Sequence, residues 1–321
     1  MSLPYLSIII PVHNEEKNIG FLYSEVLEVM KNDFSWYLYE IIIINDGSYD
    51  KTWEEMKNLR KLSKDNLVLI DTQRNYGQSI ALDIGFRYAR WDTVFTLDWD
   101  GQNDPNDMKK LFDEMNNKWF DVVAWWRKKR KDKFSVKVIT MLGRFFRKIF
   151  INDYIHDSWC TLRIYKRKCI DELILWWEMH RYIVPILEIK WFNIGEVVVN
   201  HRKREWWKSK YSFMKSVKWF IDLLYVWFIA KYQSRPLHLF WGMGLLTFLI
   251  WLIGFFFSIY EKVFFHLSLN RNWFFLLWVF LIQTWLMIFI FWIVIDILVR
   301  LHYDNWNEKR YLIKEIVRDD E

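Results

Sequence analysis

The sequence predicts an α/β fold in which helices cover both faces of a mostly parallel sheet, with two membrane-spanning helices near the C-terminus. Short apolar runs alternate with helical segments from Leu6 to Ala124, and polar clusters follow four of these runs directly. Two much longer apolar runs, Leu237 to Ile259 and Trp273 to Val299, are each long enough to cross a ~30 Å hydrocarbon core. We therefore expect a catalytic or binding domain first and a membrane hairpin after it.

The first part of the chain is expected to contain five strands, because each apolar run is short and ends at a polar or turn-forming residue. They are Leu6–Ile10, Glu40–Ile44, Leu67–Ile70, Thr93–Leu97 and Asp121–Ala124. The continuous apolar character of the first run is typical of a strand that is buried on both faces. Asn14 to Glu16 are expected to open the first helix, and further helices are expected from Gln78 to about Arg90 and after Pro105.

Polar clusters stand at the ends of four strands. They are Val12–Glu15, Asn45–Ser48, Asn75–Gln78 and Asp98–Gln102. In parallel sheets the ligand binds beyond the carboxyl ends of the strands, so these clusters are expected to share one site.

The last cluster predicts a divalent metal site. Asp98 and Asp100 project toward the same side of an extended segment, Gly101 turns the chain, and Gln102 adds a carbonyl oxygen. Two carboxylates and an amide oxygen suit Mg²⁺ or Mn²⁺ with positions left open for phosphate oxygens. The alternative is an acidic turn that caps the helix at Pro105, and the three neighbouring clusters favour the ligand site.

Charge distribution predicts the membrane orientation. Basic residues flank the two apolar runs, whereas the connecting loop from Tyr260 to Asn272 has only Lys262 and Arg271. This bias places both termini and the N-terminal domain in the cytoplasm, with the protein expected to be multi-pass in the plasma (inner) membrane. The net charge of +6 lies beside the spans and so indicates anionic lipid, not nucleic acid, as a partner. A buried helix pair in a water-soluble protein is the alternative.

The motifs Pro11-Val12-His13-Asn14-Glu15, Asn45-Asp46-Gly47-Ser48, Asn75-Tyr76-Gly77-Gln78 and Asp98-Trp99-Asp100-Gly101-Gln102 resemble those of glycosyltransferase family 2, which has the GT-A fold. Three further segments resemble the polyprenyl-phosphate hexosyltransferases of that family, which include dolichol-phosphate mannosyltransferases and bacterial undecaprenyl-phosphate glucosyltransferases. These segments are His156 to Arg163, Glu178 to Tyr182, and His201 to Arg204 with Ser209 to Tyr211. The resemblance implies a GT-A catalytic domain (1–205), a phosphate flap with an interfacial amphipathic helix (206–235), a transmembrane hairpin (236–300) and a cytoplasmic tail (301–321).

The resemblance also implies roles for single residues. The donor would be bound by Pro11, Glu15, Asp46, Gln78 and Asp98, and its diphosphate would be covered by Arg204, Ser209 and Lys210. The metal would be held by Asp98, Asp100 and Gln102, and the acceptor phosphate would be met by Arg181 and Arg202. Asp157 would orient groups at the reacting centre, with a base role as the weaker option. Arg181 and Arg204 would also assist catalysis. For Asp46 the alternative is an ordinary turn before Gly47.

The implied reaction moves a hexose, with inversion, from a UDP- or GDP-linked sugar to undecaprenyl or dolichyl phosphate. Its product would be a lipid-linked sugar for cell-envelope glycan or glycoprotein synthesis, and a lipid-sugar flippase or self-association through the spans would supply further partners. One alternative is a family 2 transferase that extends a polysaccharide, although a Gln-x-x-Arg-Trp motif is absent from the sequence. The other is an impaired donor-binding or scaffold protein.

Tryptophan is unusually frequent and glycine unusually rare. The chain has 22 Trp and 10 Gly, whereas ordinary usage near 7% gives roughly 22 Gly. Tryptophan stands where the family pattern usually has glycine at Trp91, Trp119, Trp125, Trp159, Trp177, Trp191, Trp207, Trp219 and Trp241. Glycine sites are often left-handed or tightly packed, so an indole there is destabilising. We hypothesise that UGA encodes glycine in this gene and has been read as tryptophan; a divergent protein is the alternative.

Overall fold

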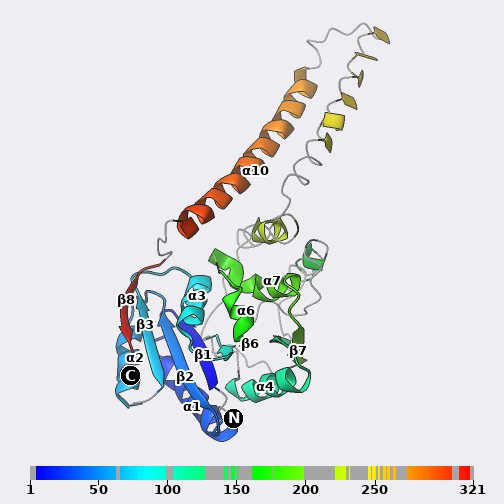
Figure 1. Cartoon of the computed structure of the whole chain (residues 1–321). Coiled ribbons are helices and arrows are strands. Elements are labelled where there is room, and N and C mark those ends of the chain that lie inside the picture. Colours follow the sequence, from blue (N-terminus) through cyan, green and yellow to red (C-terminus); the bar gives the residue numbers. More distant parts are fainter. Residues whose placement is uncertain are drawn as a thin grey trace. The chain divides into compact units, whose positions relative to one another are not determined.

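A computed structural model gives the fold of the chain (Figure 1). The structure describes residues 5–62, 66–98, 104–126, 161–175, 177–198, 221–228, 273–305 and 311–318, together with single positions between 141 and 150 and between 231 and 264. The chain divides into two compact units. The first comprises Met1–Val226 and Tyr311–Glu321, and the second comprises Trp227–Arg310.

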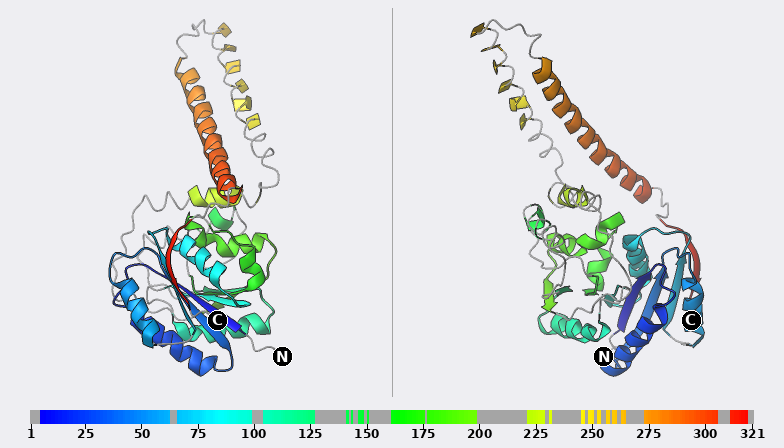
Figure 2. Two further views of the ribbon diagram at one scale, coloured as in Figure 1. Left: turned by 60° about the vertical axis from the view of Figure 1, so that its left-hand side comes forward. Right: turned by 180° about the vertical axis from the view of Figure 1, so that it is seen from behind.

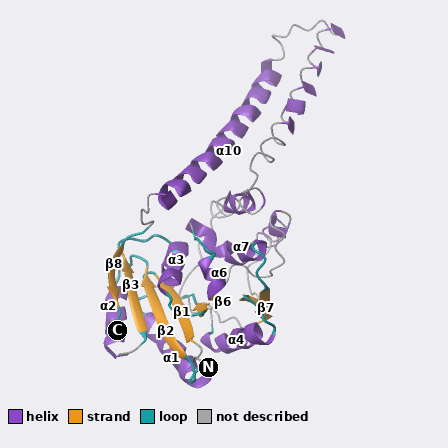
Figure 3. Cartoon of the chain, in the orientation of Figure 1, coloured by secondary structure: helices purple, strands orange, loops and turns teal. Residues whose placement is uncertain are grey.

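The first unit is built on one sheet with the strand order β7-β5-β6-β4-β1-β2-β3-β8 (Figure 3). The strands are β1 (Tyr5–Val12), β2 (Leu38–Asn45), β3 (Leu67–Thr72), β4 (Thr93–Thr96), β5 (Val122–Trp126), β6 (Arg163–Lys166), β7 (Ile194–Val198) and β8 (Ile313–Val317). Strands β4, β1, β2 and β3 are parallel neighbours, and β5 is parallel to β7. Only β6 and β8 run antiparallel to their neighbours among the described strands. The predicted mostly parallel sheet is confirmed.

Helices cover both faces of this sheet (Figure 2). One core packs side chains of α1 (Ile19–Asp33), α2 (Thr52–Leu62) and α4 (Met108–Asn117) against one face. The other core packs α3 (Gln78–Tyr88), α6 (Arg167–Asp171) and α7 (Ile183–Ile189) against the opposite face. Alternate residues of β1 divide between the two cores, with Ile8 and Ile10 in the first and Ile9 in the second. This division explains why the strand is apolar throughout.

The first helix begins later than its sequence predicts. Asn14 to Glu16 were expected to open a helix, but α1 begins at Ile19 and Asn14 has a left-handed backbone with φ 57°. The N–H groups of Asn14, Glu15 and Glu16 donate instead to the side chains of Ser48, Thr52 and Asp50, at 2.9, 2.8 and 3.3 Å. These tertiary hydrogen bonds hold the segment as a turn beyond the end of β1.

Two of the tryptophans at expected glycine positions adopt the backbone that glycine favours. Trp119 and Trp191 have φ of 58° and 65°. Each follows the C-cap of a helix, α4 and α7 respectively, and the next residue closes a Schellman motif by donating its N–H to Met115 or Leu187 at 3.1 Å. Their side chains are 80% and 93% exposed, so the indoles gain little packing in return.

Trp91 does not follow this pattern. Trp91 was expected to stand at a glycine position directly after a helix that ends at about Arg90, but α3 ends at Tyr88 with an extended Ala89 as its C-cap. The ring of Trp91 stacks on Tyr5 with centroids 3.9 Å apart. That expectation was wrong, because the helix ends before the residue that the sequence pattern suggested.

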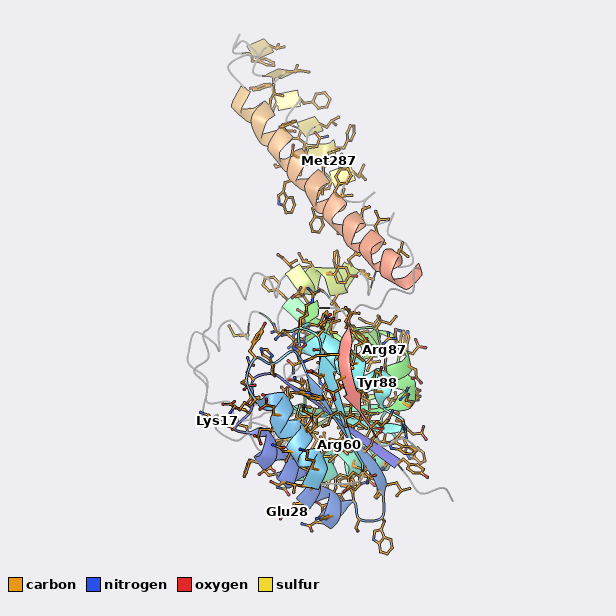
Figure 4. The ribbon with its side chains drawn as sticks, turned by 90° about the vertical axis from the view of Figure 1, so that its left-hand side faces the viewer. Lys17, Glu28, Arg60, Arg87, Tyr88 and Met287 are labelled. Atoms are coloured by element: carbon orange, nitrogen blue, oxygen red, sulfur yellow. The ribbon has the colours of Figure 1, made fainter. Side chains whose placement is uncertain are left out.

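The second apolar run forms the helix α10 (Trp273–Asn305) of the second unit. Counted over the described residues alone, no helix is long and apolar enough to cross a membrane. After α10 the chain returns to the first unit as β8, which the sequence pattern did not predict. Figure 4 views this edge of the sheet, where the N–H of Arg318 Nη2, just past the end of β8, donates to the backbone oxygen of Tyr88 at 3.3 Å.

Candidate active site

A cavity of about 330 Å³ opens at the carboxyl ends of β1, β2 and β4. This volume lies within the range usual for small-molecule sites. Its lining comes from the four predicted clusters and the first turns of α3: Pro11, Val12, His13, Glu15, Asp46, Asn75, Gly77, Gln78, Ala81 and Asp98. The donor residues predicted from β1, β2, α3 and β4 therefore lie together, as the strand-end argument expected.

Asp46 is the buried acid of this cavity. It directly follows β2 and is 4% exposed. Its Oδ1 accepts the N–H of Tyr76 and its Oδ2 accepts the N–H of Gly77, both at 2.8 Å. The carboxylate therefore holds the loop of residues 73–77, which follows the neighbouring strand β3, and a local turn before Gly47 would not do this.

The electrostatic state of Asp46 reflects two opposed effects. Burial raises the pKa of the Asp46 carboxyl above its ordinary value, while the N–H groups of Tyr76 and Gly77 act in the lowering direction. The carboxylate is thus kept in a poorly solvated site by donors that the fold supplies.

Gly47 permits the close approach of the two loops. Its φ is +57°, and a Cβ atom at this position would lie 2.2 Å from the backbone carbon of Arg74. A larger residue would push the 73–77 loop away from Asp46. The sequence Asp46-Gly47 is therefore needed as a pair.

His13 is oriented by hydrogen bonds on both ring nitrogens. The N–H of Tyr49 donates to Asn14 Oδ1 at 2.9 Å, so the Asn14 amide nitrogen faces His13 Nε2 at 3.0 Å. Nε2 must then accept, which leaves Nδ1 to donate to the backbone oxygen of Asp46 at 2.9 Å. The Nδ1–H tautomer follows from this network, and His13 is among the residues that line the cavity.

Gln78 and Asp98 join the start of α3 to the end of β4. The side-chain amide of Gln78 donates to Asp98 Oδ1. Asp98 is half-buried and lines the cavity, so its carboxylate fits a hard divalent cation that also contacts phosphate oxygens. Within the residues that the structure describes, no three acidic, His or Cys side chains form a metal-binding group. The other two expected ligands, Asp100 and Gln102, lie outside that part of the chain.

A second network lies behind the cavity. Ser79 and His180 are linked through Ser79 Oγ and His180 Nδ1 at 2.9 Å, and the N–H of His180 donates to Ser79 Oγ at 3.0 Å. The buried Arg163 donates to the backbone oxygen of His180 at 3.2 Å. Burial, with the charges of Arg181 and Arg163, holds the pKa of His180 well below its ordinary value. The imidazole is therefore neutral and fixes α3 to the 3₁₀ helix η2 (Trp177–Tyr182).

Arg181 follows His180 in η2 and is half-buried, but it is not among the residues that line the cavity. Asp157, Arg202, Arg204, Ser209 and Lys210 lie outside the described residues, as do Asp100 and Gln102. The sequence pattern did not single out His13, Asn75 or Ser79. Their position inside or beside the strand-end clusters is the signal that could have identified them.

Residues 7–174 match the family model for glycosyl transferase family 2. The dodecaprenyl-phosphate galacturonate synthase of Rhizobium johnstonii is 34% identical over 75% of this chain and 71% of its own length. The undecaprenyl-phosphate 4-deoxy-4-formamido-L-arabinose transferase of Pseudomonas fluorescens is 33% identical over 68% of this chain, and the match spans 63% of that relative's length.

Solved structures show the same fold at low sequence identity. Glucosyl-3-phosphoglycerate synthase from Mycobacterium tuberculosis, crystallised with Mn²⁺ and UDP-glucose, matches with a TM-score of 0.54 at 13% identity, covering 71% of this chain and 79% of that one. Mannosyl-3-phosphoglycerate synthase from Rubrobacter xylanophilus matches with a TM-score of 0.55 at 11% identity, covering 70% and 74%. At these identities the likeness establishes the fold.

Proposed function

The chain belongs to glycosyltransferase family 2, and from this premise we propose that it transfers a sugar from a nucleotide sugar to the phosphate of a polyprenyl lipid. The observation that carries the proposal is the convergence of the polar side chains Asp46, Gln78 and Asp98 on one cavity at the carboxyl ends of the strands. The names of the two relatives supply the acceptor class, because both are synthases or transferases of polyprenyl-phosphate sugars.

The two ends of the cavity suit the two parts of a nucleoside-diphosphate donor. The buried acid of the cavity lies on the side formed by β2, where a nucleoside could donate a hydrogen bond to the Asp46 carboxylate and make ring contact with His13. Asp98 lies at the end of β4, where a diphosphate with its cation would reach. One end of the site therefore suits a nucleoside and the other suits a metal diphosphate.

Mg²⁺ or Mn²⁺ would be held by Asp98, Asp100 and Gln102. When bound, the cation would neutralise negative charge on the donor diphosphate. Gln78 contributes from the protein side by holding Asp98 Oδ1, which restricts how the carboxylate turns. Titration of the nucleotide-sugar donor in the presence and absence of metal would report how much the cation contributes to donor affinity.

The reaction requires little proton transfer. An oxygen of the lipid phosphate, anionic at neutral pH, attacks the anomeric carbon while the bond from that carbon to the nucleoside diphosphate breaks. Configuration is thereby inverted. The flap residues Arg204, Ser209 and Lys210 would close over the leaving diphosphate, with charge neutralised by Arg204 and Lys210 and a hydroxyl donated by Ser209. The lipid phosphate would be held by Arg181 and Arg202, and Asp157 would orient the reacting groups.

The acceptor implies attachment to a membrane. The apolar runs Leu237 to Ile259 and Trp273 to Val299 support a two-span hairpin, and the basic residues beside them support cytoplasmic termini in the plasma (inner) membrane. Under this arrangement the enzyme takes its donor from the cytoplasm and its acceptor from the cytoplasmic leaflet of the membrane.

Release of nucleoside diphosphate separates an enzyme from a donor-binding scaffold. The full chain in detergent is given UDP- or GDP-linked sugars with Mn²⁺ and undecaprenyl phosphate. We expect one donor to release its nucleoside diphosphate only when both metal and lipid phosphate are present. Binding without acceptor-dependent release would reject catalysis and leave the scaffold alternative.

A further inference from the structure

The C-terminal strand reaches the candidate active site. Strand β8 pairs antiparallel with β3, from Val317 opposite Leu69 to Ile313 opposite Thr72. Because the two strands run in opposite directions, β8 begins beside the carboxyl end of β3, which is the cavity side of the sheet. The residue just before β8 is therefore placed next to the 73–77 loop.

Both backbone polar groups of Leu312 bond to that loop. The N–H of Leu312 donates to the Tyr76 hydroxyl at 3.1 Å, and the N–H of Gln73 donates to the Leu312 oxygen at 3.0 Å. The two partners of Leu312 lie at opposite ends of a four-residue stretch. The segment before β8 therefore spans the loop from its first residue to Tyr76.

Tyr76 is held from both of its ends. Its backbone N–H donates to Asp46, its hydroxyl accepts from Leu312, and the guanidinium of Arg74 lies 4.9 Å from its ring centroid. Tyr76 does not itself line the cavity, whereas its neighbours Asn75 and Gly77 do. Any effect of Tyr76 on a bound ligand must therefore pass through the positions of those neighbours.

The far end of β8 is fixed separately. Arg318 Nη2 lies 2.9 Å from Glu40 Oε2, and Glu40 also accepts the Ser7 hydroxyl at 2.7 Å. Ser7 and Glu40 lie near the amino ends of β1 and β2, which is the end of the strands opposite to the cavity. The side-chain contacts at the two ends of β8 can thus be removed one at a time.

We propose that the segment entering β8 supports the donor site from outside the cavity, with Tyr76 as the positioning residue through which the backbone of Leu312 holds the 73–77 loop against Asp46. This role rests on the proposed function, because the loop is a donor loop only if the cavity binds a nucleotide.

A strand that only covers a sheet edge would stabilise the fold without changing ligand affinity. The test therefore needs binding and stability measured on the same variants. In the full chain in detergent, Tyr76→Phe removes the hydroxyl and keeps the ring, and Arg318→Ala removes the far anchor. Binding of UDP and of GDP, each with Mn²⁺, is measured by calorimetry, and thermal unfolding is measured alongside.

We expect Tyr76→Phe to raise the Kd of the nucleotide that binds by roughly two- to tenfold, the range of a single hydrogen bond, with kcat within twofold of the unmodified protein. Arg318→Ala should lower the Tm and leave that Kd unchanged. Leu312→Pro removes the donating N–H and should raise the Kd in the unmodified protein but add nothing to Tyr76→Phe.

An unchanged Kd for Tyr76→Phe, or additive effects of Tyr76→Phe and Leu312→Pro, would overturn the positioning role while leaving the proposed function intact. If the unmodified protein bound neither nucleotide, the proposed function would fail, and the role of Tyr76 in a donor site with it. The two failures are therefore distinguishable.

Discussion

The carboxylate of Asp46 and the backbone N–H of Tyr76, thirty residues apart in the sequence, meet at 2.8 Å. With the matching bond from Gly77, this contact closes the turn after β2 onto the loop before α3. The cavity wall thus depends on a single buried acid, since both oxygens of Asp46 accept from the same loop.

Asp46→Asn tests this dependence. Asparagine has one acceptor oxygen, so its NH₂ group would face a backbone N–H, and that amide would lose its partner. We expect the nucleotide Kd to rise by roughly ten- to a hundredfold, as for loss of a hydrogen bond to a charged group. Calorimetry with Mn²⁺ measures it, and Asp33→Asn at the exposed end of α1 is the matched control. Equal affinities of the two variants would contradict the role of Asp46.

Trp119→Gly and Trp191→Gly should each stabilise the protein. A left-handed backbone destabilises a non-glycine residue by about 1 kcal/mol, and both indoles are largely exposed. We expect each change to raise the Tm by about 2–4 °C. Trp36→Gly is the control, because Trp36 is 84% exposed but is not among the described residues with positive φ.

If Trp36→Gly raised the Tm as much as the other two changes, the loss of any exposed indole would be sufficient to explain the stabilisation. The codons give independent evidence on the origin of these residues. UGA at Trp119 and Trp191 would support the reassigned code, and UGG at both positions would reject it.

His180 should make stability depend on pH below neutrality. Its folded pKa is lowered well below 6.5, so the unfolded chain binds a proton below pH 6.5 that the folded protein does not bind. The free energy of unfolding should therefore fall as the pH falls below 6.5, by up to about 1.4 kcal/mol per pH unit, and level off below the folded pKa. Thermal unfolding from pH 8 to pH 5 measures this decline.

His180→Gln should show a shallower decline over the same range, whatever its stability at pH 8. The slope is the informative quantity, because the loss of the Ser79 contact affects stability at every pH. A slope identical to that of the unmodified protein would mean that another group carries the acid sensitivity.

Much of the sheet could be predicted from the sequence, because β1, β2 and β3 are apolar runs whose burial on both faces leaves a local signature. The strand-end clusters then predicted which residues meet, and Pro11, Glu15, Asp46, Gln78 and Asp98 do line one cavity. Parallel topology alone brings these residues together, so no knowledge of side-chain packing was needed.

Contacts that depend on tertiary packing could not be predicted. The bond between Leu312 and Tyr76 joins residues 236 positions apart, and β8 is a short strand with charged Lys314 and Glu315. The start of α1 was misplaced because side chains near Asp50 take the N–H groups of residues 14–16. Neither of these long-range contacts has a local signature in the sequence.

The membrane orientation is tested by labelling. With both termini cytoplasmic, the loop from Tyr260 to Asn272 faces the opposite side. Ser268→Cys in intact cells should react with an impermeant thiol reagent, and Ser48→Cys in the first unit should react only after lysis. Labelling of Ser268→Cys confined to lysed cells would reject the orientation.

The central claim is that the sugar is delivered to a lipid phosphate, and the lipid product tests it most directly. The full chain is incubated with Mn²⁺, undecaprenyl phosphate and a panel of nucleotide sugars radiolabelled in the sugar, and the organic-phase label is counted. We expect one donor to give label in a lipid that mild acid releases as free sugar, with no product from undecaprenol, in excess chelator, or from Asp98→Ala. Label found only in a polymer, or lipid label formed equally from undecaprenol, would contradict transfer to the phosphate.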